Sequence, residues 1–233
     1  GVTGLDGRPP GHCVIIGVGP GLGAALARTF ARAGHDLTLL SRSTTTGEQL
    51  IDELAPSGGA VRADVVDLAD EHNIRLALTR AQDALGPIAV LIVNGARYSA
   101  GRARDVEAQE LATDFATNVI GATVACRAVL PGMIAAGSGT VLLTGGGAAL
   151  YPSASTPSLS ITKAGLRAYA YSLHDDLRGT GVHATTITIE GGIGSRPHFA
   201  AERIAQTYLD LHRQDPSEWT AELEYRDPPV AAG

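Results

Sequence analysis

The sequence has few cysteines, no blocks of like charge and no long apolar runs, and each absence excludes a class of function. Its two cysteines, Cys13 and Cys126, lie in separate apolar runs, which predicts buried free thiols and a reducing, cytoplasmic compartment. The net charge of -6 is spread along the chain, which argues against a nucleic-acid-binding surface or a basic membrane-binding patch. No signal-peptide pattern and no apolar stretch near the roughly 18 residues that cross a bilayer is seen, so we expect no membrane contact. No cluster of histidine, cysteine and carboxylate residues has metal-ligand spacing, so we expect no metal site.

What the sequence does contain is a 44% apolar fraction in 233 residues, which is enough for one sizeable core. We expect a flexible leader at 1–11, rich in glycine and proline, and a single domain over 12–233. Apolar runs typical of buried strands occur at 13–16, 36–40, 60–63, 88–93, 140–144 and 183–189, with a possible last strand at 221–225. Helical patterns occur at 22–33, 48–55, 69–85, 106–136, 158–178 and 200–212.

The regular alternation of strands and helices predicts the fold class. Nearly unbroken apolar strands are typical of a parallel sheet that is covered on both faces. Strands that alternate with helices form such a sheet through right-handed crossovers. The sequence therefore predicts an α/β fold, a doubly wound parallel sheet (Rossmann fold) of about seven strands with helices on both faces.

A glycine-rich loop, Gly-Val-Gly-Pro-Gly-Leu-Gly, connects the first expected strand to the first expected helix. Glycines there let the backbone turn sharply and approach a pyrophosphate, whose charge is met by free amides at the helix N-terminus. The spacing alone fits two patterns, G-x-x-x-G-x-G from Gly17 or G-x-G-x-x-A from Gly19. The predicted phosphate-binding residues are Gly17, Gly19, Gly21, Leu22 and Gly23.

The end of the second expected strand bears on the choice between NADP(H) and NAD(H). A fold that selects NAD usually places an acidic side chain there, against the ribose 2'-hydroxyl. This chain has Ser41 and Arg42 instead, and a guanidinium matches a 2'-phosphate. We therefore expect NADP(H) in preference to NAD(H). The alternative is that Arg42 is a solvated charge at a strand end.

With its later motifs the chain resembles the short-chain dehydrogenase/reductase family over nearly its whole length. The family's glycine motif corresponds to the first of the two spacings above. Its segment after the fourth strand is similar to Leu-Ile-Val-Asn-Gly-Ala at 91–96, and its catalytic asparagine and lysine correspond to Asn118 and Lys163. The resemblance implies further cofactor contacts by Asp64, Val65, Asn94, Gly95, Lys163 and Ile193. It also implies a homo-oligomer, a dimer or a tetramer.

Two catalytic positions of the family are changed in this sequence. The family's tyrosine acid, four residues before the lysine, is replaced by Leu159, and its serine is replaced by a glycine that is best aligned with Gly146. A carbonyl reduced by hydride needs a proton, and positioned general acid catalysis contributes about 10²- to 10⁴-fold. Ordinary carbonyl reduction is therefore not expected, whereas cofactor binding need not be affected.

Two tyrosines are candidates to replace the missing acid. Tyr98 follows the fourth expected strand, and Tyr151 lies in the loop after the fifth. Each also fits a simpler role as an aromatic wall of the substrate pocket. A substrate lid is expected around 191–215, with the apolar face of its helix packed over the crevice.

The sequence thus predicts an NADP(H)-binding oxidoreductase with a divergent mechanism that acts on a small organic molecule. Its candidate catalytic residues are Lys163, Asn118, Tyr98 and Tyr151. A non-redox reaction on the same fold, such as isomerisation, dehydration or cyclisation, remains an alternative. A non-catalytic, nucleotide-sensing protein is another.

Overall fold

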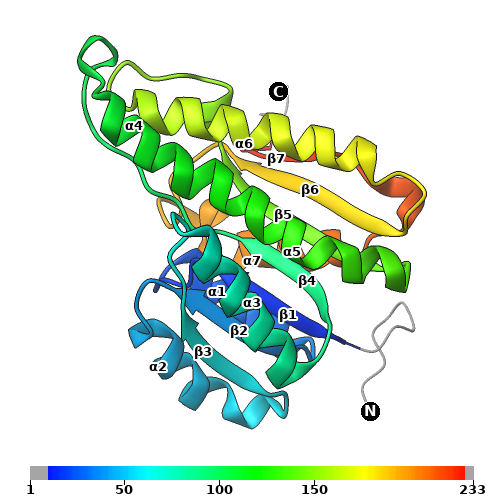
Figure 1. Ribbon diagram of the computed structural model, residues 1–233. Helices are drawn as coiled ribbons and strands as arrows, with labels where there is room; N and C mark the ends of the chain where they lie inside the picture. Colours follow the sequence, from blue (N-terminus) through cyan, green and yellow to red (C-terminus); the bar gives the residue numbers. More distant parts are fainter. Residues whose placement is uncertain (1–9, 229–233) are drawn as a thin grey trace, which may run out of the picture.

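Seven parallel strands form one twisted sheet through the middle of the protein (Figure 1). The computed structural model describes residues 10–228, so nearly all of the leader expected at 1–11 lies outside the described residues. The strands are β1 (His12–Ile16), β2 (Asp36–Ser41), β3 (Val61–Val65), β4 (Ile88–Val93), β5 (Gly139–Gly146), β6 (Val182–Ile189) and β7 (Glu222–Tyr225). Their order is β3-β2-β1-β4-β5-β6-β7. The chain therefore reverses its winding direction between β1 and β4, where ligands bind in doubly wound sheets.

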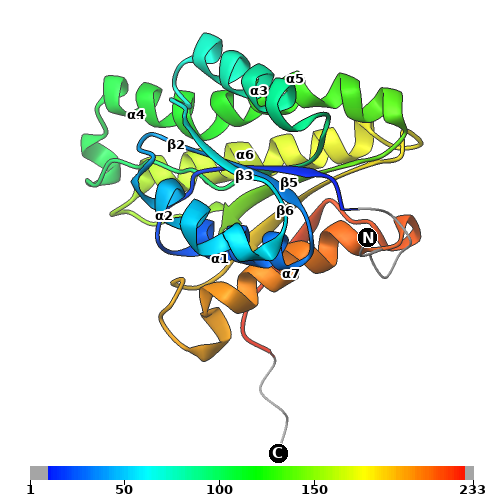
Figure 2. The same cartoon turned by 90° about the horizontal axis from the view of Figure 1, so that it is seen from below.

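Helices cover both faces of the sheet, as the alternating pattern predicts. Figure 2 shows α3 (Glu71–Leu85), α5 (Gly121–Ala136) and α6 (Pro157–Asp176) on one face, and α1 (Leu22–Arg32), α2 (Thr45–Leu54) and α7 (Ala201–Arg213) on the other. A shorter helix, α4 (Ala108–Phe115), precedes α5. The expected fold class, a doubly wound parallel sheet with helices on both faces, is confirmed.

Each face of the sheet has its own apolar core. Successive side chains of a strand point to opposite faces, and in β1 Val14 and Ile16 pack in the core under α3, α5 and α6. Cys13 and Ile15 pack in the other core, under α1, α2 and α7. Both cysteines, Cys13 and Cys126, are buried free thiols, as predicted.

The helical segment expected at 106–136 is not one regular α-helix. A π-helical turn, Ala116–Ile120, separates α4 from α5, and such turns often occur at functional sites. The whole stretch Ala108–Ala136 is by length and composition apolar enough to cross a membrane, so the expectation that no such stretch exists is wrong. Core helices of soluble proteins meet the same criterion, and α5 buries Val124 and Val129 against the sheet.

Helix α7 differs in position from the expectation. Its apolar face was expected to pack over the substrate crevice, but it packs beside α1 on the face of the sheet. Ile204 and Tyr208 on this helix are fully buried. Of the range 191–215 that was expected to form a lid, Gly191, Gly192 and Ile193 line the cleft described below.

Buried histidines make the stability of the fold sensitive to acid. The His183 ring at the start of β6 stacks on Trp219, with the ring centroids 4.7 Å apart. Burial lowers the pKa of His183 to about 4, whereas a histidine in an unfolded chain titrates near 6.5. The unfolded state thus binds more protons below about pH 6.5, so stability is lost as the pH falls from about 6.5 to about 4.

Replacement of His183 by phenylalanine should remove the contribution of His183 to this pH dependence and keep the stacking on Trp219. Urea unfolding followed by circular dichroism at pH 7.5 and pH 4.5 measures the effect. Between these pH values the wild-type protein should lose roughly 2 to 3 kcal/mol more unfolding free energy than His183→Phe. Parallel losses in the two proteins would show that His183 is not responsible.

Candidate functional site

A cleft of about 1200 Å³ lies beyond the carboxyl ends of the central strands. It extends from the glycine loop after β1, past the end of β2, to the segments that follow β4, β5 and β6. The cleft thus lies at the point where the winding direction of the sheet reverses, as the fold class predicts. One continuous cleft of this size has room for an extended ligand together with a second, smaller molecule.

The glycines of the loop fall into two groups. Gly17 has φ +93°, and a Cβ there would lie 2.2 Å from the Gly95 amide nitrogen, so the fold itself requires glycine. A Cβ on Gly23 would lie 2.6 Å from the Gly17 carbonyl oxygen, so close packing requires glycine there too. Around Gly19 and Gly21, in contrast, a Cβ would meet nothing within 4 Å. Packing within the protein therefore does not explain the last two glycines.

The space beside Gly19 and Gly21 fits the pyrophosphate of a dinucleotide. The amides of Gly21, Leu22 and Gly23 lie at the start of α1, where an amide has no carbonyl acceptor one turn earlier in the helix, and are available as donors. The first turn of α1 holds no acidic residue, so the positive end of the helix dipole is not neutralised. This part of the cleft therefore forms an anion-binding cradle. It combines glycines that packing does not require, free amides and a helix N-terminus.

Thr144, at the end of β5, joins the residues at the floor of the cleft through hydrogen bonds. Its hydroxyl donates to Asn94 Oδ1 at 2.9 Å and accepts a hydrogen bond from the buried Tyr208 hydroxyl at 2.7 Å. Asn94 Nδ2 in turn donates to the Gly17 carbonyl at 2.9 Å. The Thr144 carbonyl accepts a 2.9 Å hydrogen bond from Lys163 Nζ. This network fixes the glycine loop, Asn94 and Lys163 relative to one another.

Lys163 is a buried cation in the lining of the cleft. It lies on α6 and is 8% exposed, and burial lowers its pKa to about 8. Its ammonium is therefore still mainly protonated at neutral pH. Leu159 lies one helical turn earlier and lines the same cleft. A Cβ on Gly146 would lie 3.7 Å from Lys163 Cε, which is ordinary contact, so these two positions offer the cleft no side-chain proton donor.

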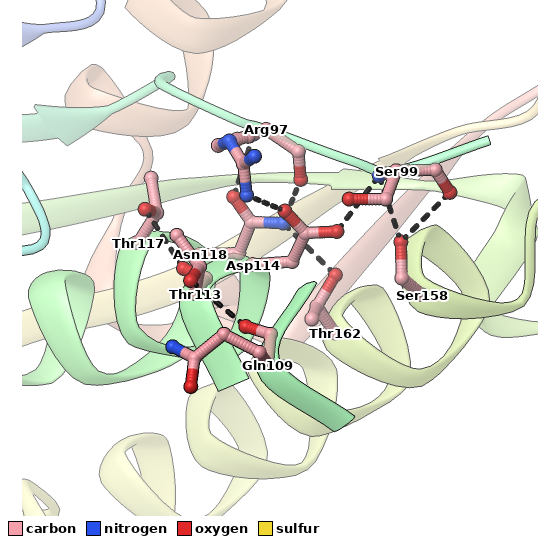
Figure 3. A network of polar contacts seen from close by, with 9 residues as sticks. All are labelled: Arg97, Ser99, Gln109, Thr113, Asp114, Thr117, Asn118, Ser158 and Thr162. Carbon is pink, nitrogen blue, oxygen red and sulfur yellow. Dashed lines mark hydrogen bonds and ion pairs between the residues drawn. The ribbon is translucent and has the colours of Figure 1, made fainter. Parts of the chain in front are cut away.

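Asn118 lies in the π-helical turn and holds the loop after β4. Its Oδ1 accepts a 2.7 Å hydrogen bond from the Arg97 amide, and its Nδ2 donates to the Arg97 carbonyl (Figure 3). Nδ2 also donates to Thr162 Oγ1 on α6 at 3.0 Å. Asn118 is buried and therefore shapes the cleft by positioning Arg97.

At the other end of the cleft, Arg42 follows β2. It is exposed, lines the cleft and makes no hydrogen bond or ion pair with any residue that the structure describes. The hydroxyl-bearing residues Ser41, Ser43 and Thr46 line the cleft beside it. Arg42 and these hydroxyls form a group of donors for an anion.

Most residues predicted from the sequence lie together in the cleft. Those that line it are Gly17, Gly19, Gly21, Leu22, Gly23, Ser41, Arg42, Asn94, Gly95, Tyr98, Lys163 and Ile193. Asp64 and Val65 are not among the lining residues; Asp64 Oδ2 accepts from Arg80 Nε at 2.8 Å, and the next two residues, Val66 and Asp67, line the cleft. Tyr151 also lies outside the lining, with 68% of its surface exposed.

Three residues that shape the cleft were not predicted from the sequence. Thr144 carries the floor network, Arg97 lines the cleft, and Asp114 is a fully buried carboxylate that binds Arg97. A buried acid on a helix is uncommon without a partner. The sequence gives no sign that Asp114 is buried. It lies between Glu110 and an apolar segment, a position where an exposed residue would fit equally well.

The chain is similar to known proteins along most of its length. A sequence model of the family described as short chain dehydrogenase matches residues 11–195. The chain is 29% identical to sulfoacetaldehyde reductase 2 of Chromohalobacter salexigens over 216 residues, 92% of this chain and 80% of that protein. It is 27% identical to the NADP-dependent 3-hydroxy acid dehydrogenase YdfG of Shigella flexneri over 225 residues, 90% of this chain and 88% of that protein. A short-chain dehydrogenase structure from Rhodopseudomonas palustris superposes with a TM-score of 0.84 at 25% identity, covering 94% of this chain and 99% of that one.

Proposed function

Because the chain belongs to the short-chain dehydrogenase/reductase family, we propose that it binds NADP(H) and oxidises or reduces a small organic substrate by a divergent proton step. The cleft supports this proposed function most strongly. Its glycine cradle, Arg42 and Lys163 lie along one continuous surface, as an extended dinucleotide requires. Leu159 and Gly146 at the centre of the same surface leave the usual proton step without its donor.

The cofactor would be held by charged groups and by glycines that leave room for it. Gly19, Gly21 and the start of α1 face the pyrophosphate, and Lys163 holds the nicotinamide ribose. Asp64 and Val65, at the end of β3, border the adenine beside Val66 and Asp67, and Asn94, Gly95 and Ile193 line the nicotinamide end. When bound, the nicotinamide ring supplies or accepts a hydride.

NADP(H) is favoured over NAD(H) by the charges at the adenosine end. Arg42 is an unpaired cation among the described residues at the end of β2, where a 2'-phosphate would lie and where selection of NAD would need an acid. A guanidinium binds phosphate through several donors. The similar dehydrogenase of Shigella flexneri is described as NADP-dependent, which supports the same preference.

Replacement of Arg42 by alanine should weaken NADPH binding about 10- to 100-fold and leave NADH binding nearly unchanged. The reason is that hydrogen bonds to a charged group contribute about 1.5–3 kcal/mol. Titration of nicotinamide fluorescence measures both affinities. Arg32→Ala, an exposed arginine in the last turn of α1, is the control. Equal losses for NADPH and NADH in Arg42→Ala would contradict the assignment.

The proton step would differ from that of the family because no donor occupies the positions of Leu159 and Gly146. Tyr98 lines the cleft and is the stronger of the two tyrosine candidates, since Tyr151 lies outside the lining. The Lys163 ammonium is a second nearby acid. Hydride transfer to an already protonated imine or an activated alkene would need no tyrosine acid at all.

A panel of ketones, imines and activated alkenes, each followed by loss of NADPH absorbance, tests the proposed function. Turnover of any of these substrate classes supports the proposed function. The class that reacts also shows whether the reaction needs a proton donor from the protein. The absence of a proton donor at Leu159 and Gly146 also favours a second candidate, a nucleotide-sensing protein or a non-redox enzyme of this fold. Tight NADPH binding without NADPH consumption on any substrate would favour that second candidate.

We also propose how the protein assembles and where it is located. Family members typically act as oligomers, and apolar side chains at Ile120 and Ile134 on the α5 side and at Ile161 and Tyr171 on α6 are partly exposed. A cytoplasmic homo-oligomer that uses these long helices, with 12–233 as one domain, is the form we propose.

A further inference from the structure

The loop after β4 presents an arginine that is fixed at three points. The Arg97 amide donates to Asn118 Oδ1 at 2.7 Å, and the Arg97 carbonyl accepts from Asn118 Nδ2. Its guanidinium forms an ion pair with Asp114 through Nη1 (Figure 3). Loop residues are usually among the more mobile parts of a protein. Both partners of Arg97 belong to helical segments, Asp114 to α4 and Asn118 to the π-helical turn, so the loop is tied to these helices.

Both carboxylate oxygens of Asp114 bind this loop. Its side chain is 0% exposed, one oxygen binds Arg97, and the other accepts a 2.7 Å hydrogen bond from the Ser99 amide. Ser158 Oγ on α6 also accepts from the Ser99 amide and donates to the Ser99 carbonyl (Figure 3). Burial of a carboxylate is costly, and a buried ion pair is weak evidence for stability. The arrangement is better explained by the orientation that it imposes on the guanidinium.

Most donors of the Arg97 guanidinium remain available. A guanidinium has five N–H donors, and only Nη1 of Arg97 bonds to another of the described residues. The side chain is 39% exposed and lines the cleft together with Tyr98 and Leu159. Because Arg97 lines this part of the cleft, its free donors are available to a substrate there.

The charge of the cleft lining as a whole favours anionic ligands. Three cations line the cleft, Arg42, Lys163 and Arg97, against one acid, Asp67, although the whole chain carries a net charge of -6. In the proposed function, Arg42 and Lys163 serve the cofactor. Arg97 is the cation left for the substrate.

We propose that Arg97 binds a carboxylate of the substrate, which makes the substrate class a small organic acid. This inference rests on the proposed function. A planar carboxylate matches the fork of a guanidinium, which can bind it through two hydrogen bonds. The Asp114 carboxylate already offsets part of the positive charge of Arg97, so a monoanion fits better than a doubly charged phosphate. Tyr98 and Leu159 supply the apolar wall for the rest of a small molecule.

Binding of oxamate and of its neutral ester, ethyl oxamate, tests this proposal. Both are measured by isothermal titration calorimetry with wild-type protein and Arg97→Gln, in the presence of saturating NADP⁺. Wild-type protein should bind oxamate more tightly than the ester. Arg97→Gln should lose roughly 10- to 100-fold in oxamate affinity and nothing in ester affinity. Arg104→Gln, an exposed arginine of the same segment that does not line the cleft, should behave as wild type.

Two further measurements separate a binding role from a structural one. The NADP⁺ affinity of Arg97→Gln should equal that of wild type, and circular dichroism should show a folded protein. Its melting temperature should fall, because glutamine can donate to Asp114 but does not offset its charge. Arg97→Lys keeps the charge without the planar fork and should lose about 10-fold in oxamate affinity. If Arg97→Gln fails to fold, this second variant decides the question.

The two proposals fail in different ways. Tight NADP⁺ binding with equal affinity for oxamate and its ester, or with no loss in Arg97→Gln and Arg97→Lys, overturns the carboxylate assignment alone. Absence of NADP⁺ binding in folded wild-type protein overturns the proposed function. The oxamate comparison is then made with the cofactor-free protein, where the same preference and the same losses would still support Arg97 as a carboxylate site.

Discussion

Replacement of Leu159 by tyrosine should increase the reduction of simple ketones by NADPH by about 10²- to 10⁴-fold. Leu159 and Lys163 are one helical turn apart on α6, and both line the cleft. A phenol at position 159 would therefore lie beside the Lys163 ammonium, whose positive charge lowers the pKa of a neighbouring phenol. Initial rates of NADPH oxidation with cyclohexanone and ethyl pyruvate measure the gain.

Leu159→Phe is the matched control, because it adds the ring without the hydroxyl. Its rates should remain at the wild-type level. Addition of Gly146→Ser to Leu159→Tyr should raise the rate further, since a Cβ at Gly146 meets only ordinary contacts and a hydroxyl there can donate to the developing oxyanion. Equal rates for the tyrosine and phenylalanine variants would show that more than the proton donor is missing from the site.

Replacement of Gly21 by aspartate should weaken NADPH binding at least about 100-fold, or about 2.7 kcal/mol, without unfolding the protein. A Cβ at this position would meet nothing within 4 Å, so there is room for a side chain. The carboxylate would occupy the space of the pyrophosphate and place a negative charge at the N-terminus of α1. Fluorescence titration with NADPH measures the loss, and circular dichroism confirms that the variant is folded.

Gly132→Asp controls for the general effect of such a change. A Cβ at Gly132 also meets nothing within 4 Å, but this residue lies on α5 and does not line the cleft. Its NADPH affinity should equal that of wild type. Unchanged affinity in Gly21→Asp would mean that the pyrophosphate lies elsewhere, and the proposed cofactor position would be wrong.

The fold and the glycine loop could be predicted from the sequence because both depend on local patterns. A buried parallel strand such as β4 is an unbroken apolar run, and its bounds, Ile88–Val93, were predicted to the residue. The glycine loop indicates phosphate binding because it lies between a strand and a helix. Even so, the sequence could not separate Gly17, which packing requires, from Gly21, which packing does not.

The polar framework of the site could not be predicted, because it joins residues that are far apart in the chain. Asn94 and Gly17 are 77 residues apart, and Thr144 and Tyr208 are 64 apart. Such contacts have no periodic signal. Arg97 and Asp114 were missed for the same reason, because a charged residue in a loop or on a helix is usually exposed.

We propose that the cofactor site is complete although the tyrosine acid is absent. Titration of the wild-type protein with NADPH, followed by nicotinamide fluorescence, tests it most directly, because it needs no knowledge of the substrate. We expect saturable binding of one NADPH per chain, at least about 10-fold tighter than NADH. Absence of saturable binding of either nucleotide to the folded protein would contradict it.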